Sequence, residues 1–199
     1  GIWVRLTAPF TPYLSEELWH LLGKEGFVSL AEWPVYDGSK IDIGAEESED
    51  LVKSLIEDTV NITRATKIVP KRICYYVAAD WKWKAYLETL RRSLAGKVEM
   101  KDVIKDLMKN PEMQKKAKDL AAFLGKNIME INTASEDLKN RKLEVGALDE
   151  KTVIEEAKSF LQKEFGAEVS VYNEEDMEKY DPRNRASQSK PYRPAIYME

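Results

Sequence analysis

Residues 6–34 read LTAPFTPYLSEELWHLLGKEGFVSLAEWP, and this stretch decides the fold of the first part of the chain. Thr11 followed by Pro12 predicts a helix start, because threonine caps helix N-termini and proline loses no hydrogen bond at the first helical position. Gly23 predicts the end of that helix. The apolar residues between them recur at helical spacing and form one stripe suited to a small helical bundle: Tyr13, Leu14, Leu18, Leu21 and Leu22.

The segments that follow predict a loop and then a long helix. Residues 37–49 are polar and contain glycine, which is typical of a loop. From about residue 47 to residue 66, apolar residues recur at intervals of three, four and seven, which predicts a helix. We expect this helix to pack against the first two helical segments and to complete the bundle.

After the long helix the periodicity changes. Residues 73–77 are rich in strand-forming side chains, and three amphipathic helices follow between residues 80 and 124. Residues 134–147 are polar and lack periodicity, which predicts a connection without regular structure. A capped helix then spans residues 149–166, a second strand follows at once, and residues 195–198 are apolar enough to form a third strand.

These elements predict a mainly α protein in two parts. Residues 1–68 form a small helical bundle, and residues 69–199 form an α+β domain with a short sheet. We expect residues 180–194 to be a mobile basic tail, because the polar composition of residues 183–190 is typical of disorder. A chain that ends after Ser189 should then stay folded, since its core helices and first two strands are intact.

Composition limits the possible functions, and charge points to one region. The chain has 199 residues, 43% of them apolar, without a membrane-spanning run or a secretory signal. A single cysteine excludes an intrachain disulfide and fits a reducing cytoplasm. Residues 1–63 carry a net charge of −8, residues 64–119 carry +8 and residues 120–199 carry −4. The middle third is therefore the candidate surface for a polyanion.

The literal residues of the opening stretch carry a family resemblance. APFTPYLSEELW followed by SLAEWP resembles the helical anticodon-binding domain of class I aminoacyl-tRNA synthetases of the leucyl, isoleucyl and valyl group. The resemblance is closest to leucyl-tRNA synthetases of the archaeal and eukaryotic cytosolic type, and the rest of the chain is similar to their C-terminal region in order and character. It implies a fragment of a cytoplasmic leucine–tRNA ligase whose catalytic and editing domains, with ATP and Mg²⁺, lie elsewhere in the parent chain.

No catalytic or metal-binding site can be assembled from these residues. His20 is the only histidine and Cys74 the only cysteine, so neither a zinc cluster nor a Ser/His/Asp set is available. The H-I-G-H-like and K-M-S-K-S-like elements with which a class I synthetase holds ATP do not occur in the sequence. We therefore expect this fragment to need no cofactor and to be catalytically inactive alone.

Basic residues interleaved with aromatic ones are the candidates for RNA contacts, because cations bind phosphates and rings stack on bases. Ordinary solvation of amphipathic helices is the alternative explanation. In the enzymes that the chain resembles, the helical domain meets the inner corner of the tRNA, and the C-terminal domain meets the long variable arm of leucine tRNA. The candidates are Lys67, Lys71, Arg72, Lys82, Lys84, Arg91, Arg92, Arg183, Arg185, Lys190, Tyr192, Arg193, Ile196 and Glu199.

Two other functions remain open at this point. An isoleucyl- or valyl-type relative would recognise the anticodon loop, which the leucyl type largely ignores. A module for protein interaction could instead use the acidic first third of the chain.

Glu199 is a candidate RNA contact because a carboxylate can accept a hydrogen bond from a base amino group. A frayed chain terminus without a function is an equally good interpretation of this residue.

Overall fold

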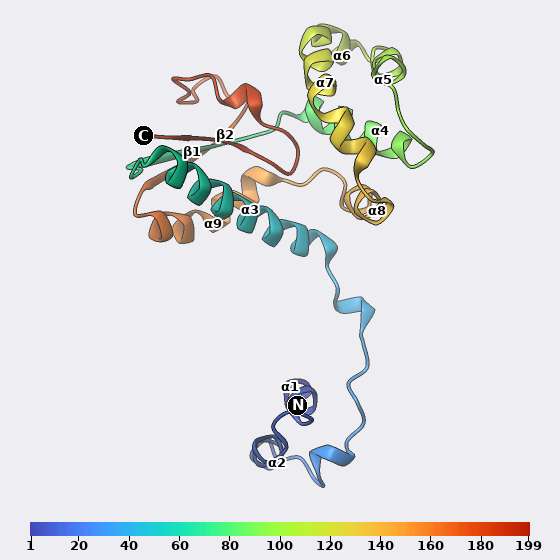
Figure 1. Cartoon of the computed structure of the whole chain (residues 1–199), viewed down its shortest axis with the longest axis vertical. Coiled ribbons are helices and arrows are strands. Elements are labelled where there is room, and N and C mark those ends of the chain that lie inside the picture. The colour runs from blue at the N-terminus through green and yellow to red at the C-terminus, as the bar shows by residue number, and fades with distance from the viewer. The chain divides into compact units, whose positions relative to one another are not determined.

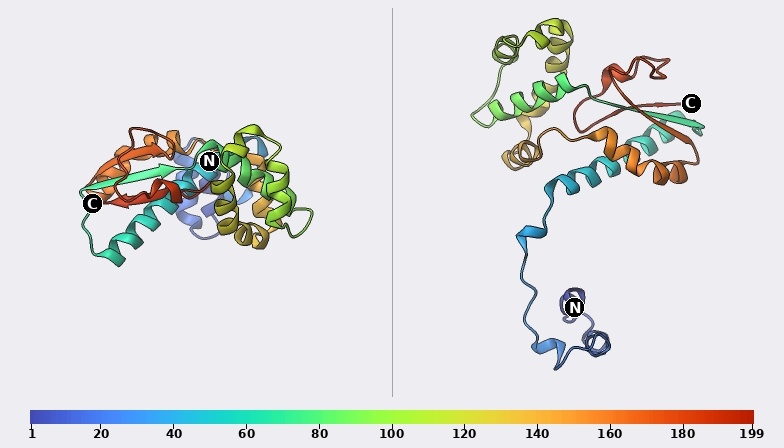
Figure 2. Two further views of the ribbon diagram at one scale, coloured as in Figure 1. Left: turned by 90° about the horizontal axis from the view of Figure 1, so that it is seen from above. Right: turned by 180° about the vertical axis from the view of Figure 1, so that it is seen from behind.

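The structure is a computed structural model that describes all 199 residues, and its two compact units are residues 1–42 and 43–199. Each unit has its own core of buried apolar side chains. The helices and strands of each unit can be followed in Figures 1 and 2. Pro12 is the first residue of a helix, as predicted, although the Thr11 side chain makes no capping bond. Unit 1 (residues 1–42) consists of α1 (Ile2–Thr7), α2 (Pro12–Leu21) and two 3₁₀ turns, Val28–Leu30 and Gly38–Lys40.

The predicted apolar stripe of α2 lies on the surface of unit 1. The side chain of Tyr13 is 92% exposed and that of Leu21 is 74% exposed. Instead, α2 turns Trp19 inward, where it packs with Val4 and Val28. Unit 1 itself therefore does not cover the stripe, because periodicity identifies an amphipathic helix without specifying what its apolar face contacts.

Unit 2 (residues 43–199) combines a short sheet with helices, so the predicted fold class is confirmed. The three strands have the order β2-β1-β3, with β1 parallel to β2 and antiparallel to β3. No helix is long and apolar enough to cross a membrane. The elements are α3 (Ile43–Thr66), β1 (Arg72–Val77), α4 (Asp80–Ser93), α5 (Met100–Leu107), α6 (Pro111–Lys115), α7 (Ala117–Thr133), α8 (Glu136–Val145), α9 (Glu150–Phe165), β2 (Glu168–Asn173), a 3₁₀ turn (Ala186–Gln188) and β3 (Ala195–Met198).

Helices α3 and α9 cover one face of the sheet (Figure 1). Leu55 of α3 and Ile154 of α9 lie in one buried cluster with Tyr75 of β1, whose hydroxyl is 2.9 Å from that of Thr59. The long helix therefore shares the core of unit 2, and its packing against the first two helical segments stays a prediction. The compact units divide between residues 42 and 43, whereas the predicted domain limit, residue 68, falls after α3.

The opposite face of the sheet is covered by residues 180–188, which belong to the predicted mobile tail. Ala186 is 1% exposed and packs against Tyr76 of β1. The Tyr76 hydroxyl donates to the carbonyl of Tyr180 at 2.5 Å, and the Asp181 carboxylate accepts two backbone N–H groups of the following turn. The expectation of a mobile tail is corrected, because polar side chains that suggested disorder build turns against the sheet.

The helices that follow β1 form a second core. Its centre holds the rings of Trp81 and Phe123, which meet edge to face with 5.8 Å between centroids. Helix α8 occupies most of the segment for which a polar connection was expected, so that expectation is wrong. Ser135 caps α8 by accepting a hydrogen bond from the N–H of Leu138 at 3.3 Å. The helix is polar on most sides, and periodicity therefore gives no signal for it.

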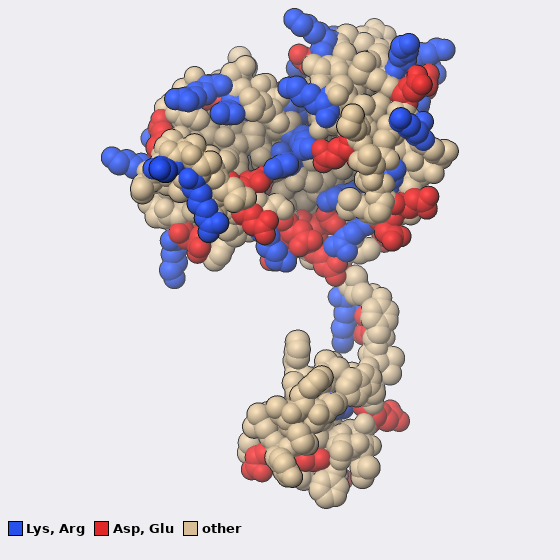
Figure 3. Space-filling view, viewed as in Figure 1, with Lys and Arg blue, Asp and Glu red and all other residues tan.

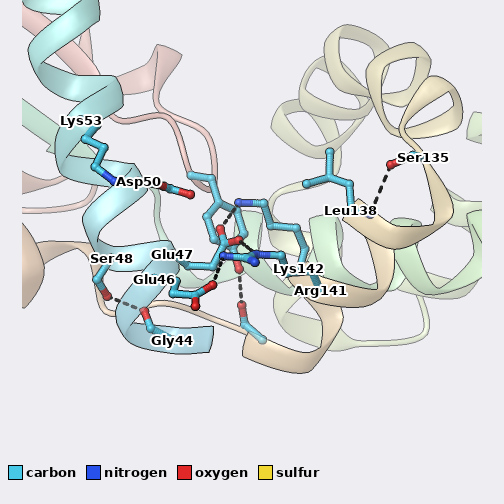
Figure 4. Close-up of polar contacts among 12 residues, drawn as sticks. Gly44, Glu46, Glu47, Ser48, Asp50, Lys53, Ser135, Leu138, Arg141 and Lys142 are labelled. Atoms are coloured by element: carbon cyan, nitrogen blue, oxygen red, sulfur yellow. Dashed lines mark hydrogen bonds and ion pairs between the residues drawn. The ribbon is translucent and has the colours of Figure 1, made fainter. Parts of the chain in front are cut away.

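A network of ion pairs joins α3 to α8 (Figure 4). Glu47 is only 4% exposed, and its carboxylate accepts from Arg141 Nε at 2.5 Å and from Lys142 Nζ. Glu46 binds the same guanidinium at 2.9 Å. Burial acts to raise the pKa of Glu47, but the bonds from Lys142 and Arg141 outweigh it and lower the pKa. Helix α3 is thus tied to the sheet and to the helical part of unit 2.

Candidate nucleic-acid interface

One group of candidates gathers where β1 begins and β3 ends. The Arg72 guanidinium donates to the Glu199 carboxylate at 3.0 Å and lies 5.1 Å from the ring centre of Tyr180. The hydroxyls of Tyr180 and Tyr197 donate to the other Glu199 oxygen at 2.9 and 3.1 Å. We call Arg72, Tyr180, Tyr197 and Glu199 the strand-end cluster. It offers a cation, a carboxylate and aromatic rings on one surface, which suits both phosphates and bases.

Glu199 is held firmly in this cluster. Its carbonyl accepts the backbone N–H groups of Lys71 and Arg72 at 2.6 and 3.0 Å, so it is not a frayed terminus in the structure. The hydrogen bond to Glu199 raises the pKa of Tyr180 above its usual value. A base amino group that binds the carboxylate must compete with two tyrosines and an arginine. Three further candidates, Lys67, Lys71 and Arg183, are exposed.

A second group surrounds a hollow between α3 and the segment that leads into β3. Arg185, Lys190, Arg193 and Ile196 line this hollow, which has a volume of about 510 Å³. We call it the basic hollow. Ile196 also contributes to the core of the sheet and pairs in register with a residue of β1, so its backbone position is fixed. The structure thus brings together four candidates that lie within twelve residues of one another in the chain. Helix α3 also lines the hollow, and no pattern in the sequence predicted that contact.

Lys82, another candidate RNA contact, is buried and bonded inside unit 2, which disfavours the predicted role. Its side chain is 4% exposed and its ammonium donates to the carbonyls of Ser187 and Ser189 at 3.0 and 2.7 Å. The same ammonium is 2.8 Å from the carboxylate of Glu174. Burial lowers the pKa of Lys82, while Glu174 acts in the opposite direction. The lysine ties α4 to the end of β2 and to the segment that leads into β3.

Tyr192 is also used inside the protein rather than as a stacking surface. Its ring is half-buried, with the Lys142 ammonium 3.4 Å from the ring centre, and its backbone has a φ of 63°. Its N–H donates to the carboxylate of buried Glu150 at 2.6 Å. Burial raises the pKa of Glu150 to about 8, although this bond and one from Ala78 act to lower it. These contacts explain why a tyrosine keeps a left-handed backbone, which is normally unfavourable.

The candidates on α4 do not join either group. Lys84 pairs with Glu112 at 2.6 Å, and Arg91 and Arg92 pair with acidic neighbours on α4 and α5. On the face drawn in Figure 3, acidic side chains lie among the basic ones across unit 2. The aromatic residues interleaved with Arg72, Lys82 and Lys84 in the sequence are buried: Tyr75, Tyr76, Trp81 and Trp83.

Four residues of these sites were missed by the sequence analysis. Tyr180 and Tyr197 complete the strand-end cluster, while Asp58 and Glu130 bind cations of the basic hollow. The cations that Asp58 and Glu130 bind lie 135 and 60 residues away in the chain, and a pattern of local spacing cannot reveal them. No group of three His, Cys, Asp or Glu side chains is placed to hold a metal ion.

Residues 1–74 match the family model of the anticodon-binding domain of tRNA ligase. Over nearly its whole length the chain is also similar to leucine–tRNA ligases. It is 39% identical to that of Methanosarcina barkeri over 197 residues and 42% identical to that of Pyrococcus abyssi over 199 residues, covering 99% and 100% of the chain. The chain is thus similar to one part of the leucine–tRNA ligases, as the resemblance in the sequence predicted.

The chain corresponds to only part of these enzymes. It spans 20% of the M. barkeri enzyme, 18% of the P. abyssi enzyme and 21% of the leucine–tRNA ligase of Methanococcoides burtonii, to which it is 38% identical over 200 residues. About four-fifths of such an enzyme thus lies outside the matched region.

Proposed function

We propose that the chain is the tRNA-binding portion of a leucine–tRNA ligase. The observation that carries this proposal is the similarity to leucine–tRNA ligases over 99–100% of the chain, with an anticodon-binding domain in its first 74 residues. The exposed cations of the strand-end cluster and the basic hollow support it, because phosphate contacts supply most of the affinity of proteins for nucleic acids.

In this proposal the chain positions leucine tRNA through its inner corner and its long variable arm. Exposed Lys67, Lys71 and Arg183, with Arg72, bind the phosphate backbone, while Glu199 and the rings beside it meet unpaired bases. Leucylation with ATP and Mg²⁺ takes place elsewhere in the full cytoplasmic enzyme. The chain alone binds tRNA without activating leucine.

Binding of the purified chain to leucine tRNA tests this function. We expect saturable binding that survives exchange of the anticodon, because the proposed contacts lie outside the anticodon loop. The logarithm of the affinity should fall linearly with the logarithm of the salt concentration, by roughly 0.7–0.9 for each phosphate contacted.

Two results would contradict this prediction. Affinity that depends on the anticodon would favour an isoleucyl- or valyl-type function. The absence of salt-dependent RNA binding would favour a module for protein interaction. A matched control is the chain with Lys53 replaced by Ala. This lysine is exposed on α3, pairs with Asp50 and lines neither the strand-end cluster nor the basic hollow. Its loss should leave the affinity unchanged.

A further inference from the structure

Each of two cations in the basic hollow is already paired with a carboxylate from a different helix. Arg193 binds Asp58 of α3 through two contacts, Nε to Oδ2 at 3.1 Å and Nη2 to Oδ1 at 3.2 Å. Lys190 binds Glu130 of α7 at 2.5 Å. The hydrogen bond to Asp58 is the main cause of a raised pKa of Arg193, and the charge of Glu130 adds to it. Both cations therefore already bind an internal anion where they could bind an external one, and one of these anions, Asp58, itself lines the hollow.

The arrangement around Arg193 matches the way in which an arginine binds a phosphate. A carboxylate and a phosphate both accept two parallel N–H bonds from one guanidinium, so each can take the place of the other. The Arg193 side chain is 62% exposed, which leaves it accessible to a ligand. Exposed ion pairs of this kind contribute little to the free energy of folding, so a stabilising role does not account for this pair. The side chain of nearby Arg185 donates to the amide oxygen of Gln188 at 3.2 Å. An amide carries no charge, so the positive charge of Arg185 still attracts anions to the hollow.

We infer that Asp58 and Glu130 are built-in counter-ions of the RNA-binding hollow, which a phosphate of the bound RNA must displace. This inference rests on the proposed function. A phosphate that binds a free arginine releases cations from the RNA. When it displaces Asp58 instead, the freed carboxylate attracts cations again, and the net release is smaller. The two acids thus lower both the affinity of the hollow and its dependence on salt.

The test compares Asp58→Asn with the unmodified chain, using leucine tRNA and a tRNA with a short variable arm. The asparagine has nearly the same shape but no charge, so Arg193 becomes free for phosphate. We expect affinity to rise about 2–5-fold for both RNAs, the range that corresponds to one exposed ion pair. The slope of log affinity against log salt should steepen by roughly 0.7–0.9.

Two controls separate this effect from a general change of charge. Glu57→Gln removes the same charge from the neighbouring position of α3, where the side chain is exposed and does not line the hollow. Its effect should be clearly smaller. In a chain that also carries Arg193→Ala, Asp58→Asn should change neither affinity nor slope, because the two substitutions share one interaction.

The inference is overturned if Asp58→Asn leaves the slope unchanged, matches Glu57→Gln, or acts equally without Arg193. It is also overturned if neither chain binds RNA. If both chains bind the two RNAs equally well but Asp58→Asn still steepens the slope, the counter-ion role stands and the proposed preference for leucine tRNA fails. Glu130→Gln is the second variant, which tests Lys190 in the same way if Asp58→Asn does not fold.

Discussion

A chain that ends after Ser189 is expected to lose the cooperative folding of unit 2. The deletion removes β3, which pairs with the central strand, and it removes Met198 from the core of the sheet. It also takes away the N–H of Tyr192, a hydrogen-bond partner of the buried Glu150 carboxylate. Lost burial and an unsatisfied acid together amount to about 5 kcal/mol, comparable with the whole stability of many domains.

Urea unfolding followed by circular dichroism measures this effect. The full chain should give a cooperative transition for unit 2, and the shortened chain should give none, or one at much lower urea. The matched control is Glu199→Gln, which keeps β3 and its backbone pairing and should preserve the transition. A shortened chain that unfolds at the midpoint of the full chain would show that residues 190–199 are a dispensable tail after all.

Replacement of Lys82 by methionine is expected to destabilise unit 2 by about 3 kcal/mol. Methionine fills a similar volume but leaves the Glu174 carboxylate and the carbonyls of Ser187 and Ser189 without their donor. Removal of one partner of a buried ion pair typically costs ~3–5 kcal/mol, and Glu174, which is 15% exposed, can recover some solvation. The free energy of unfolding from urea titration measures the loss.

Lys84→Met is the control, because Lys84 lies two positions along the same helix with its side chain 52% exposed and paired with Glu112. Its cost should stay within about 0.5 kcal/mol, as is usual for surface positions. Equal stability of the two variants would contradict the structural role of Lys82. The loss of RNA affinity without any loss of stability would restore Lys82 as a direct contact.

The sequence predicted those elements whose signal is local. The strands at residues 73–77 and 195–198 and the capped helix that ends at Gly166 all appear in the structure. Their composition, caps and stop signals lie within the elements themselves. The sheet order β2-β1-β3 could not be predicted, because it depends on contacts between residues more than ninety positions apart.

The candidate site was less predictable because burial and pairing are properties of the tertiary structure. Lys82 and Lys84 look alike in the sequence, yet one is buried and the other is exposed. The polar run 183–190 resembles a disordered tail, but Asp181 and Tyr76 give it partners that hold it on the sheet. Asp58 gives no sequence signal for its role, since Arg193 lies 135 residues away.

Recognition of the long variable arm of leucine tRNA is the central element of the proposed function. The decisive measurement compares the dissociation constants of this chain for leucine tRNA and for the same tRNA with its variable arm shortened, at one salt concentration. We expect removal of the arm to weaken binding by about tenfold or more, equivalent to about 1.4 kcal/mol. Equal dissociation constants for the two RNAs would show that the chain does not recognise the variable arm.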